Sequence, residues 1–379
     1  MRRVTYVSAA VLVVGAFLVG YAHARGDRAT TPVPVPTIVD QVREALASDY
    51  YRPVPPRVLR LASVDRMISA LGDPYTAYLP ESDYALLRAE TSGSYAGIGV
   101  SVVPGRAGLL VVSTRPGPGR AAGLRPGDTI VGIGATPTAR LAPAQALARI
   151  AGRAGTTVQL EFLRRGHIHS LRVRRADLRA PNVTGRLAMF GERRWGVLRV
   201  DSFAAGTARM VRGELRRLGR RGAAGFVLDL RGNPGGLLDQ AVAVASLFLD
   251  RGTIVTLRGL HLPERTYRAQ HGAVTARPLV VLVDRATASS AEVVAAALRD
   301  HHRAEIVGQR TYGKALVQSV DPLGGGGALE LTVAHYYTPV GTDISGRGLR
   351  PDVPAVDHPG TAVDEALVAA LRTLARPAA

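Results

Sequence analysis

Hydrophobic positions change their spacing along the chain, and each change marks a new segment. Residues 37–92 repeat apolar side chains at helical spacing, as at Ile38, Val42 and Leu46, which predicts an N-terminal helical segment. Residues 93–178 instead contain short apolar runs divided by Gly, Pro and Asp, which predicts a compact strand-rich module. Its expected strands are 98–102, 109–112, 129–133, 158–162 and 169–173, and its expected short helices are 119–122 and 142–151.

The next segment, residues 179–355, alternates strands with helices. Continuous apolar strands are expected at 225–230 and 279–283, each followed by a turn and a helix, at 237–249 and 290–299. Shorter strands are expected at 304–307 and 315–320. Such alternation predicts a layered α/β domain. A final helix, 362–374, is expected within a C-terminal segment of residues 356–379.

The first residues have the pattern of a targeting segment. Arg2 and Arg3 precede an uncharged run from 4 to 22, and small residues follow at Ala22 and Ala24. Residues 1–24 therefore predict a secretory signal peptide or an uncleaved membrane anchor. A proline-rich linker, 25–36, follows. Either interpretation places the rest of the protein outside the cytoplasm, secreted or held to a membrane by one segment.

Composition narrows the chemistry. The chain has 379 residues, 46% hydrophobic and 21% charged, which is globular composition. It has no cysteine, which excludes disulfides, zinc-thiolate sites and thiol nucleophiles. The net charge of +18 raises the alternative of a polyanion-binding protein. The basic residues are spread along the chain without interleaved aromatic residues, so we expect solvated surfaces and no nucleic-acid partner.

Lys314 is the only lysine, since the other 47 basic residues are arginine. Unlike arginine, a lysine can lose its proton when buried and act as a base. Its surroundings, Gly308 to Lys314, also come close to a phosphate-binding P-loop. Ala315 lacks the hydroxyl of that motif, and a strand rather than a helix is expected next, so nucleotide binding is disfavoured.

Ser289 lies where an expected strand turns into a helix, a position that suits a nucleophile. Taken alone, the segment from Ser289 to Glu292 is more simply a helix-capping box. The turn that contains Gly235 and Gly236 has exposed amides suited to an oxyanion, although a tight turn also explains its glycines. Lys314 is then a candidate base for Ser289. None of the nine histidines has a context that singles it out as a competing base.

Together these segments resemble the carboxyl-terminal processing peptidases, serine proteases of family S41 with a PDZ domain. The resemblance runs from about residue 71 to 353. The segments that carry it are LGDPYTAYL (71–79), GSYAGIGV (93–100), AGLRPGD (122–128), LDLRGNPGG (228–236), TASSAE (287–292), RTYGK (310–314) and HYYTP (335–339). Thr287, Ser290, Ala291 and His335 depart from the usual family residues, and Ser290 is a second candidate nucleophile by adjacency.

The resemblance implies a fold, a reaction and a set of site residues. The fold is α/β: a layered protease core of the crotonase/ClpP-like type with an inserted PDZ-like β-rich domain. The reaction is hydrolysis of unfolded or C-terminally exposed protein tails, without metal or other cofactor. Implied site residues are the nucleophile Ser289, the base Lys314, its orienting residue Gln318, the oxyanion donors Gly235, Gly236 and Ser290, and the peptide-carboxylate loop Gly97, Ile98, Gly99 and Val100.

The resemblance also leaves partners open. A homodimer and an activating partner are both compatible with it, and in the family the PDZ-like domain gates the site. The competing hypothesis is a catalytically silent PDZ-bearing protein that binds peptides at the cell envelope. That hypothesis predicts loss of Ser289 or Lys314, and both are present.

Overall fold

The computed structural model describes residues 36–379 except 93, 106, 115–116, 142–145, 147–148, 180–181, 359–360, 362 and 377–379. The predicted leader or anchor (1–24) and the predicted linker, apart from Pro36, therefore lie outside the described residues. Among the helices within the described ranges, none combines the length and the apolar character needed to cross a membrane.

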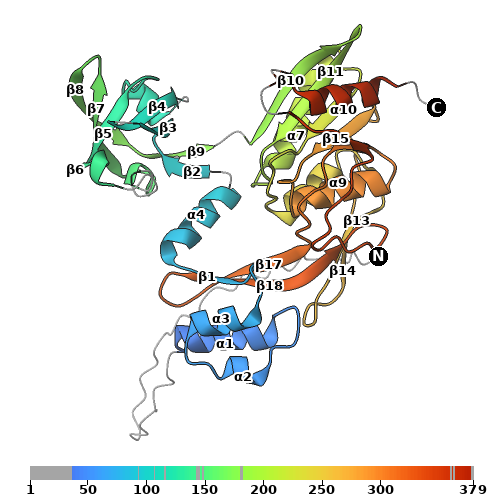
Figure 1. The fold of residues 1–379 in the computed structure, drawn as a ribbon, viewed down its shortest axis with the longest axis horizontal. Helices are drawn as coiled ribbons and strands as arrows, with labels where there is room; N and C mark the ends of the chain where they lie inside the picture. The colour runs from blue at the N-terminus through green and yellow to red at the C-terminus, as the bar shows by residue number, and fades with distance from the viewer. Residues whose placement is uncertain are drawn as a thin grey trace, which may run out of the picture. The chain divides into compact units, whose positions relative to one another are not determined.

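A mainly parallel sheet forms the centre of the C-terminal half (Figure 1). Its strand order is β10-β11-β12-β15-β16-β19, with β10 antiparallel to β11 and the others parallel. Every residue of β12 and β15 is buried, as expected for inner parallel strands covered on both faces. The strands are β10 (Val183–Phe190), β11 (Arg193–Val200), β12 (Phe226–Asp229), β15 (Leu279–Val283), β16 (Glu305–Gly308) and β19 (Val353–Pro354).

Helices cover both faces of this sheet. On one face Leu228 and Val281 pack with the helices that follow the strands, and on the other Val227 and Val280 pack with the last helix. Alternate residues of a strand point to opposite faces, so this division follows from the pleat. The layered α/β core expected from the alternation is thus present. The helices are α7 (Thr207–Arg220), α8 (Leu238–Ala245), α9 (Ser290–Asp300) and, on the second face, α10 (Glu365–Ala375).

A second sheet links this core to the N-terminal segment. Its order is β1-β18-β13-β14, and β17 also pairs with β18. In β18, Ala334 and Tyr336 belong to the main core, whereas Leu329 and Leu331 pack with the N-terminal helices. The strands are β1 (Ala77–Leu79), β13 (Thr253–Arg258), β14 (Arg265–Arg268), β17 (Leu316–Pro322) and β18 (Ala328–Tyr337).

The prediction of a purely helical segment over 37–92 is wrong at one place. Ala77–Leu79 forms β1, antiparallel to β18, between helices. A strand of three residues is too short to register in a helical period, and its pairing partner lies 250 residues away. The helices are α1 (Ile38–Ser48), α2 (Pro56–Leu59), α3 (Val64–Leu71) and α4 (Glu81–Ser92).

The strand-rich module has its own hydrophobic core, which includes Ile98, Leu160 and Phe162. The five predicted strands correspond to β3 (Val100–Gly105), β4 (Gly108–Thr114), β5 (Thr129–Ile133), β7 (Thr157–Arg164) and β8 (His167–Arg174), joined in that order. Of the predicted helix 142–151, residues 142–145 and 147–148 lie outside the described residues. The remaining elements are β2 (Ser94–Gly97), α5 (Pro118–Ala121), β6 (Thr136–Pro137), η1 (Thr138–Arg140) and β9 (Ala176–Arg179).

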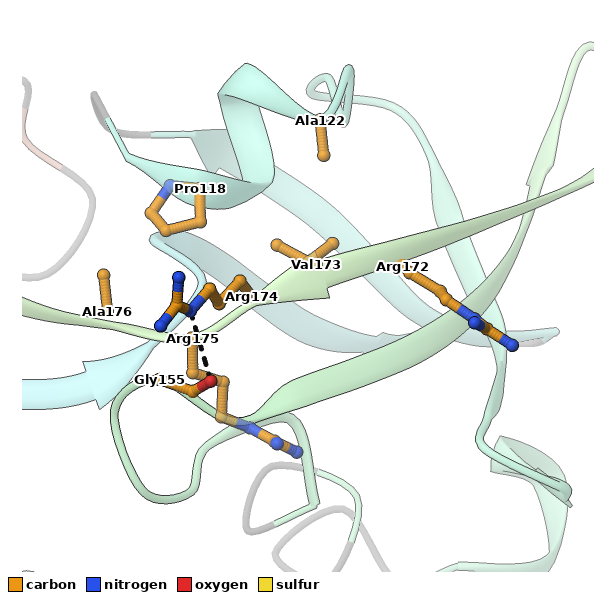
Figure 2. A pocket seen from close by; sticks show the side chains of 8 residues that line it. All are labelled: Pro118, Ala122, Gly155, Arg172, Val173, Arg174, Arg175 and Ala176. Atoms are coloured by element: carbon orange, nitrogen blue, oxygen red, sulfur yellow. Dashed lines mark hydrogen bonds between the residues drawn. The ribbon is translucent and has the colours of Figure 1, made fainter.

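The net positive charge is concentrated in this module because acidic residues are scarce there, although the basic residues themselves are spread along the chain. Residues 94–179 hold 13 arginines and only three acidic residues, a net +10 of the chain's +18. A surface hollow of about 560 Å³ lies in this module, and its lining residues include Arg172, Arg174 and Arg175 (Figure 2). The Arg175 guanidinium donates to the carbonyl oxygens of Ile150 (3.0 Å) and Arg149 (2.7 Å), so it serves the packing of the module itself.

Arg231 joins the end of β12 to the last helix. Its guanidinium lies 2.8 Å from the carboxylates of both Asp229 and Asp364 and is only 16% exposed. We expect Arg231→Leu to lower the free energy of unfolding in urea by about 2–4 kcal/mol, because the buried carboxylate of Asp229 and the partly exposed one of Asp364 lose their partner. Arg258→Leu, which breaks the exposed pair with Glu264, should cost about 1 kcal/mol or less. Equal losses in the two variants would contradict this prediction.

Candidate active site

The residues that the sequence singled out for catalysis line one cavity of about 950 Å³. They belong to three segments: the start of α9, the segment that leads into β17, and the turn after β12. None of the described histidines is among the lining residues. The cavity is lined by, among others, Gly235, Gly236, Ser289, Ser290, Lys314 and Gln318.

Ser289 has an unusual backbone at the end of the turn from β15 to α9. Its φ is 55° and its ψ is −124°, a region that non-glycine residues rarely adopt. Its side chain is partly exposed to the cavity. The Glu292 carboxylate accepts the Ser289 N–H at 2.9 Å, which is the carboxylate half of the predicted capping box.

The turn before Ser289 is locked to the Gly-rich turn. The buried Thr287 hydroxyl lies 2.9 Å from the carbonyl oxygen of Leu230, and the Asp284 carboxylate accepts the Gly232 N–H at 3.0 Å. Ser290, by contrast, is buried and donates its hydroxyl to the carbonyl oxygen of Gly236 at 2.8 Å. The geometry therefore distinguishes the two adjacent serines, with only Ser289 partly exposed.

The Gly-rich turn lies directly against Ser289. A Cβ at Gly235 would come 2.8 Å from the Ser289 Cβ, so only glycine permits this approach. The Gly235 N–H donates to the side-chain oxygen of Asn233 at 2.9 Å. The N–H groups of Gly236 and Ser290 have no hydrogen-bond acceptor among the described residues. Of the three candidate oxyanion donors, only Gly235 therefore has its N–H bonded to another described residue.

Lys314 lies beside an aromatic ring and acts electrostatically on a nearby carboxyl group. Its Nζ is 4.9 Å from the centre of the Tyr75 ring, within the range of a cation–π contact. Glu330 also lines the cavity; burial raises the pKa of its carboxyl, and the positive charge of Lys314 opposes that rise. Burial, together with a hydrogen bond to Tyr312, raises the pKa of Tyr75 to about 12.

Gln318 lines the same cavity as Lys314. Lys314 precedes β17, and the register with β18 shifts between Val317 and Gln318, so simple strand alternation does not relate the two residues. The Gln318 amide nitrogen lies 3.5 Å from the Thr332 hydroxyl. Since β17 rather than a helix follows Lys314, the P-loop alternative lacks its helix.

Sequence reasoning missed several residues of this site: Tyr75, Glu330 and Tyr336. Tyr75 and Tyr336 lie within two of the segments that carry the family resemblance, 71–79 and 335–339, whereas Glu330 lies in neither. Only the pairing of β1, β17 and β18 brings these residues to the region of Lys314. No group of acidic or histidine side chains suited to a metal occurs among the described residues. The proposed carboxylate loop is separate from the cavity, with Gly99 at φ 78° and Ile98 buried.

Comparisons with known proteins agree with this arrangement. Residues 194–355 match the model of peptidase family S41, and residues 96–174 match that of the PDZ domain. The carboxyl-terminal-processing protease of Picosynechococcus is 36% identical over 306 residues, which cover 79% of this chain and 74% of that protein. This chain belongs to peptidase family S41. The matching members of this family are serine peptidases of the carboxyl-terminal processing type. The chain is therefore a hydrolase that acts on protein substrates.

Further members of the S41 family extend the likeness. The carboxy-terminal processing protease CtpA of Bacillus subtilis is 32% identical over 320 residues, covering 84% of this chain and 68% of its own. Among solved structures, the photosystem II D1 C-terminal processing protease has a TM-score of 0.54 and 29% identity, covering 84% of this chain and 92% of that one. The S41 protease fold with a PDZ domain, expected from the resemblance, is therefore confirmed.

Proposed function

We propose that this S41 protein cleaves unfolded or C-terminally exposed protein tails, with Ser289 as nucleophile and Lys314 as general base. The observation that carries the proposal is that Ser289, Lys314 and the Gly-rich turn line one cavity although the sequence separates them widely. With no described histidine among the lining residues, the lysine is the basic side chain available to accept a proton from Ser289, since arginine stays protonated.

In the first step the Ser289 hydroxyl oxygen attacks the scissile carbonyl carbon, and its proton passes to the neutral amine of Lys314. The tetrahedral intermediate collapses to an acyl-enzyme as the Lys314 ammonium returns that proton to the leaving amine. A water molecule gives a proton to Lys314 and attacks the ester carbonyl. The second tetrahedral intermediate then collapses as Lys314 returns that proton to the Ser289 oxygen, which releases the acid product and restores Ser289 and the neutral lysine. Gln318, beside Lys314 in the cavity, orients the amine by a hydrogen bond in the loaded enzyme.

The oxyanion of each intermediate needs preorganised donors. We assign this role to the N–H groups of Gly236 and Ser290, because both lack an acceptor among the described residues. Ser290 follows Ser289 directly, and its hydroxyl donates to the Gly236 carbonyl oxygen at 2.8 Å. Gly235 contributes space: its missing side chain lets the Gly-rich turn approach the nucleophile.

The PDZ-like domain captures the substrate. A peptide tail adds as a strand beside β3, and its carboxylate lies in the loop of Gly97, Ile98, Gly99 and Val100. The N–H of Gly119 donates to the Ile98 carbonyl oxygen at 2.6 Å, which holds this loop against α5. The domain also gates access to the cavity. We place the enzyme outside the cytoplasm, secreted or anchored by its first segment.

A single experiment tests the proposal. The full chain is incubated with β-casein, an unfolded protein, with and without a serine-directed fluorophosphonate, and the labelled peptide is identified by mass spectrometry. We expect cleavage, its loss on labelling, and a label on Ser289. A label on Ser290 would contradict the assignment of the nucleophile. Absence of both cleavage and label would favour the silent peptide-binding alternative.

A further inference from the structure

Two side chains connect the backbones of Ser289 and Lys314, which are 25 residues apart in the sequence. One carboxylate oxygen of Glu292 accepts the N–H of both residues, each at 2.9 Å. The hydroxyl of Tyr336 lies 3.1 Å from the carbonyl oxygen of Ser289 and 2.7 Å from that of Lys314. The N–H groups of the pair thus meet at Glu292, and their carbonyl groups meet at Tyr336.

Tyr336 is fixed in position by burial and by a backbone hydrogen bond. It lies in β18, its side chain is only 2% exposed, and its N–H donates to the carbonyl oxygen of Ala315 at 3.0 Å. Burial raises the pKa of its hydroxyl well above the usual range, so the group remains a donor. A buried hydroxyl needs partners, and the two carbonyl oxygens are the ones within hydrogen-bond distance.

Glu292 is also fully buried. Burial raises the pKa of its carboxyl, and its hydrogen-bond donors oppose that rise. Besides the two N–H groups, it accepts the N–H of Gly313 at 2.9 Å and the hydroxyl of Thr311. It therefore holds the whole segment before Lys314 against the first turn of α9.

Ser289 requires such support. A non-glycine residue at φ 55° and ψ −124° is strained and persists only where its surroundings fix it from several sides. Its N–H donates to Glu292, and its carbonyl oxygen lies within hydrogen-bond distance of the Tyr336 hydroxyl. The same two side chains contact the N–H and the carbonyl group of Lys314, so they fix the two residues relative to each other.

We propose that Tyr336 is a positioning residue for catalysis, which together with Glu292 fixes Ser289 and Lys314 at their working separation. The inference rests on the proposed function, because it assigns Tyr336 a role through those two residues. Tyr336→Phe keeps the ring and removes only the hydroxyl. Tyr337→Phe is the matched control on the same strand: its ring is covered by Arg258, and its hydroxyl has no acceptor among the described residues.

The test compares both variants with the unaltered full chain in two assays: kcat and KM for β-casein, and the rate at which a fluorophosphonate labels Ser289. Since small misplacements of reacting groups are costly, we expect Tyr336→Phe to lower kcat and the labelling rate by about tenfold to a hundredfold. KM should change by about twofold or less, because the aromatic ring and the rest of the cavity wall remain in place. Tyr337→Phe should match the unaltered protein in both assays.

The outcomes separate this inference from the proposed function. Unchanged kcat and labelling in Tyr336→Phe, or a raised KM with unchanged kcat, would overturn the positioning role while leaving Ser289 and Lys314 in theirs. If the unaltered protein neither cleaves nor reacts, both proposals fail together. Glu292→Gln provides a second variant should Tyr336→Phe not fold. It keeps the size of the side chain but weakens the acceptor for both N–H groups, and it should show the same fall in kcat at nearly constant KM.

Discussion

Replacing Lys314 by arginine is expected to abolish cleavage of unfolded β-casein while the protein stays folded. Arginine keeps the positive charge and much of the length, but it does not give up its proton in proteins. It therefore cannot accept the proton of Ser289. General base catalysis contributes roughly 10²–10⁴-fold, and a fixed cation in its place removes that contribution entirely. The measurement is the rate of β-casein cleavage at equal concentrations of folded protein, with folding checked by circular dichroism.

Arg310→Lys is the matched control for this exchange. Arg310 lies four residues earlier in the same segment, is exposed, and donates to the carbonyl oxygen of Arg347 at 3.0 Å. We expect Arg310→Lys to cleave at nearly the rate of the unaltered protein, because neither Arg310 nor Arg347 lines the cavity. Undiminished cleavage by Lys314→Arg would refute the lysine base and return a histidine to consideration.

Replacing Gly235 by alanine is expected to reduce kcat/KM by about a hundredfold or more. The new Cβ would come 2.8 Å from the Ser289 Cβ and 3.1 Å from both the Ala288 carbonyl oxygen and the Ser290 N. All three atoms belong to the turn that holds Ser289, the proposed nucleophile, so the clash is relieved only by moving Ser289 and the Gly-rich turn apart. The backbone at Gly235 has φ +109°, which adds strain of its own.

Gly272→Ala is the control that separates the effect of the steric clash at Gly235 from the effect of its backbone strain. Gly272 has φ +107°, almost the same as Gly235, but nothing lies within 4 Å of a Cβ built there. This variant pays a similar conformational cost and should keep its activity. Comparable loss in both variants, measured as kcat/KM for β-casein with melting temperatures alongside, would show that destabilisation rather than displacement of Ser289 is responsible.

Much of the fold follows from local sequence patterns. The continuous apolar run Leu279–Val283 predicts a buried strand, and it is one in every residue. Helix α9 begins at Ser290, as its capping box indicates. The prediction of a helix over 237–249 is wrong at its C-terminal end, where apolar residues continue beyond the helix. Helix α8 ends at Ala245, yet Phe248 and Leu249 remain buried, so the apolar pattern extends past the helix that it was expected to describe.

The candidate site likewise has features that the sequence predicts and features that only the structure shows. The motifs around Ser289, Lys314 and the Gly-rich turn are continuous stretches, and residue type and spacing are enough to single them out. Which amides are available for an oxyanion is a different matter. It depends on Asn233 accepting the Gly235 N–H, an orientation that no spacing rule predicts. The adjacent serine, Ser290, is likewise distinguished from Ser289 only in the structure, where its hydroxyl donates to the carbonyl oxygen of Gly236.

The sequence by itself determined the class of chemistry: a serine at a strand-to-helix turn, a lone lysine, a glycine-rich turn and a PDZ-like module, each encoded within a few neighbouring residues. Only the tertiary structure decided what surrounds the lysine and what holds the pair together. Tyr75 enters because the segment around β1 pairs with β18, and Tyr336 enters from β18 itself. Contacts of that kind depend on sheet pairing across hundreds of residues, whereas turns, caps and strand periodicity depend on the nearest neighbours along the chain.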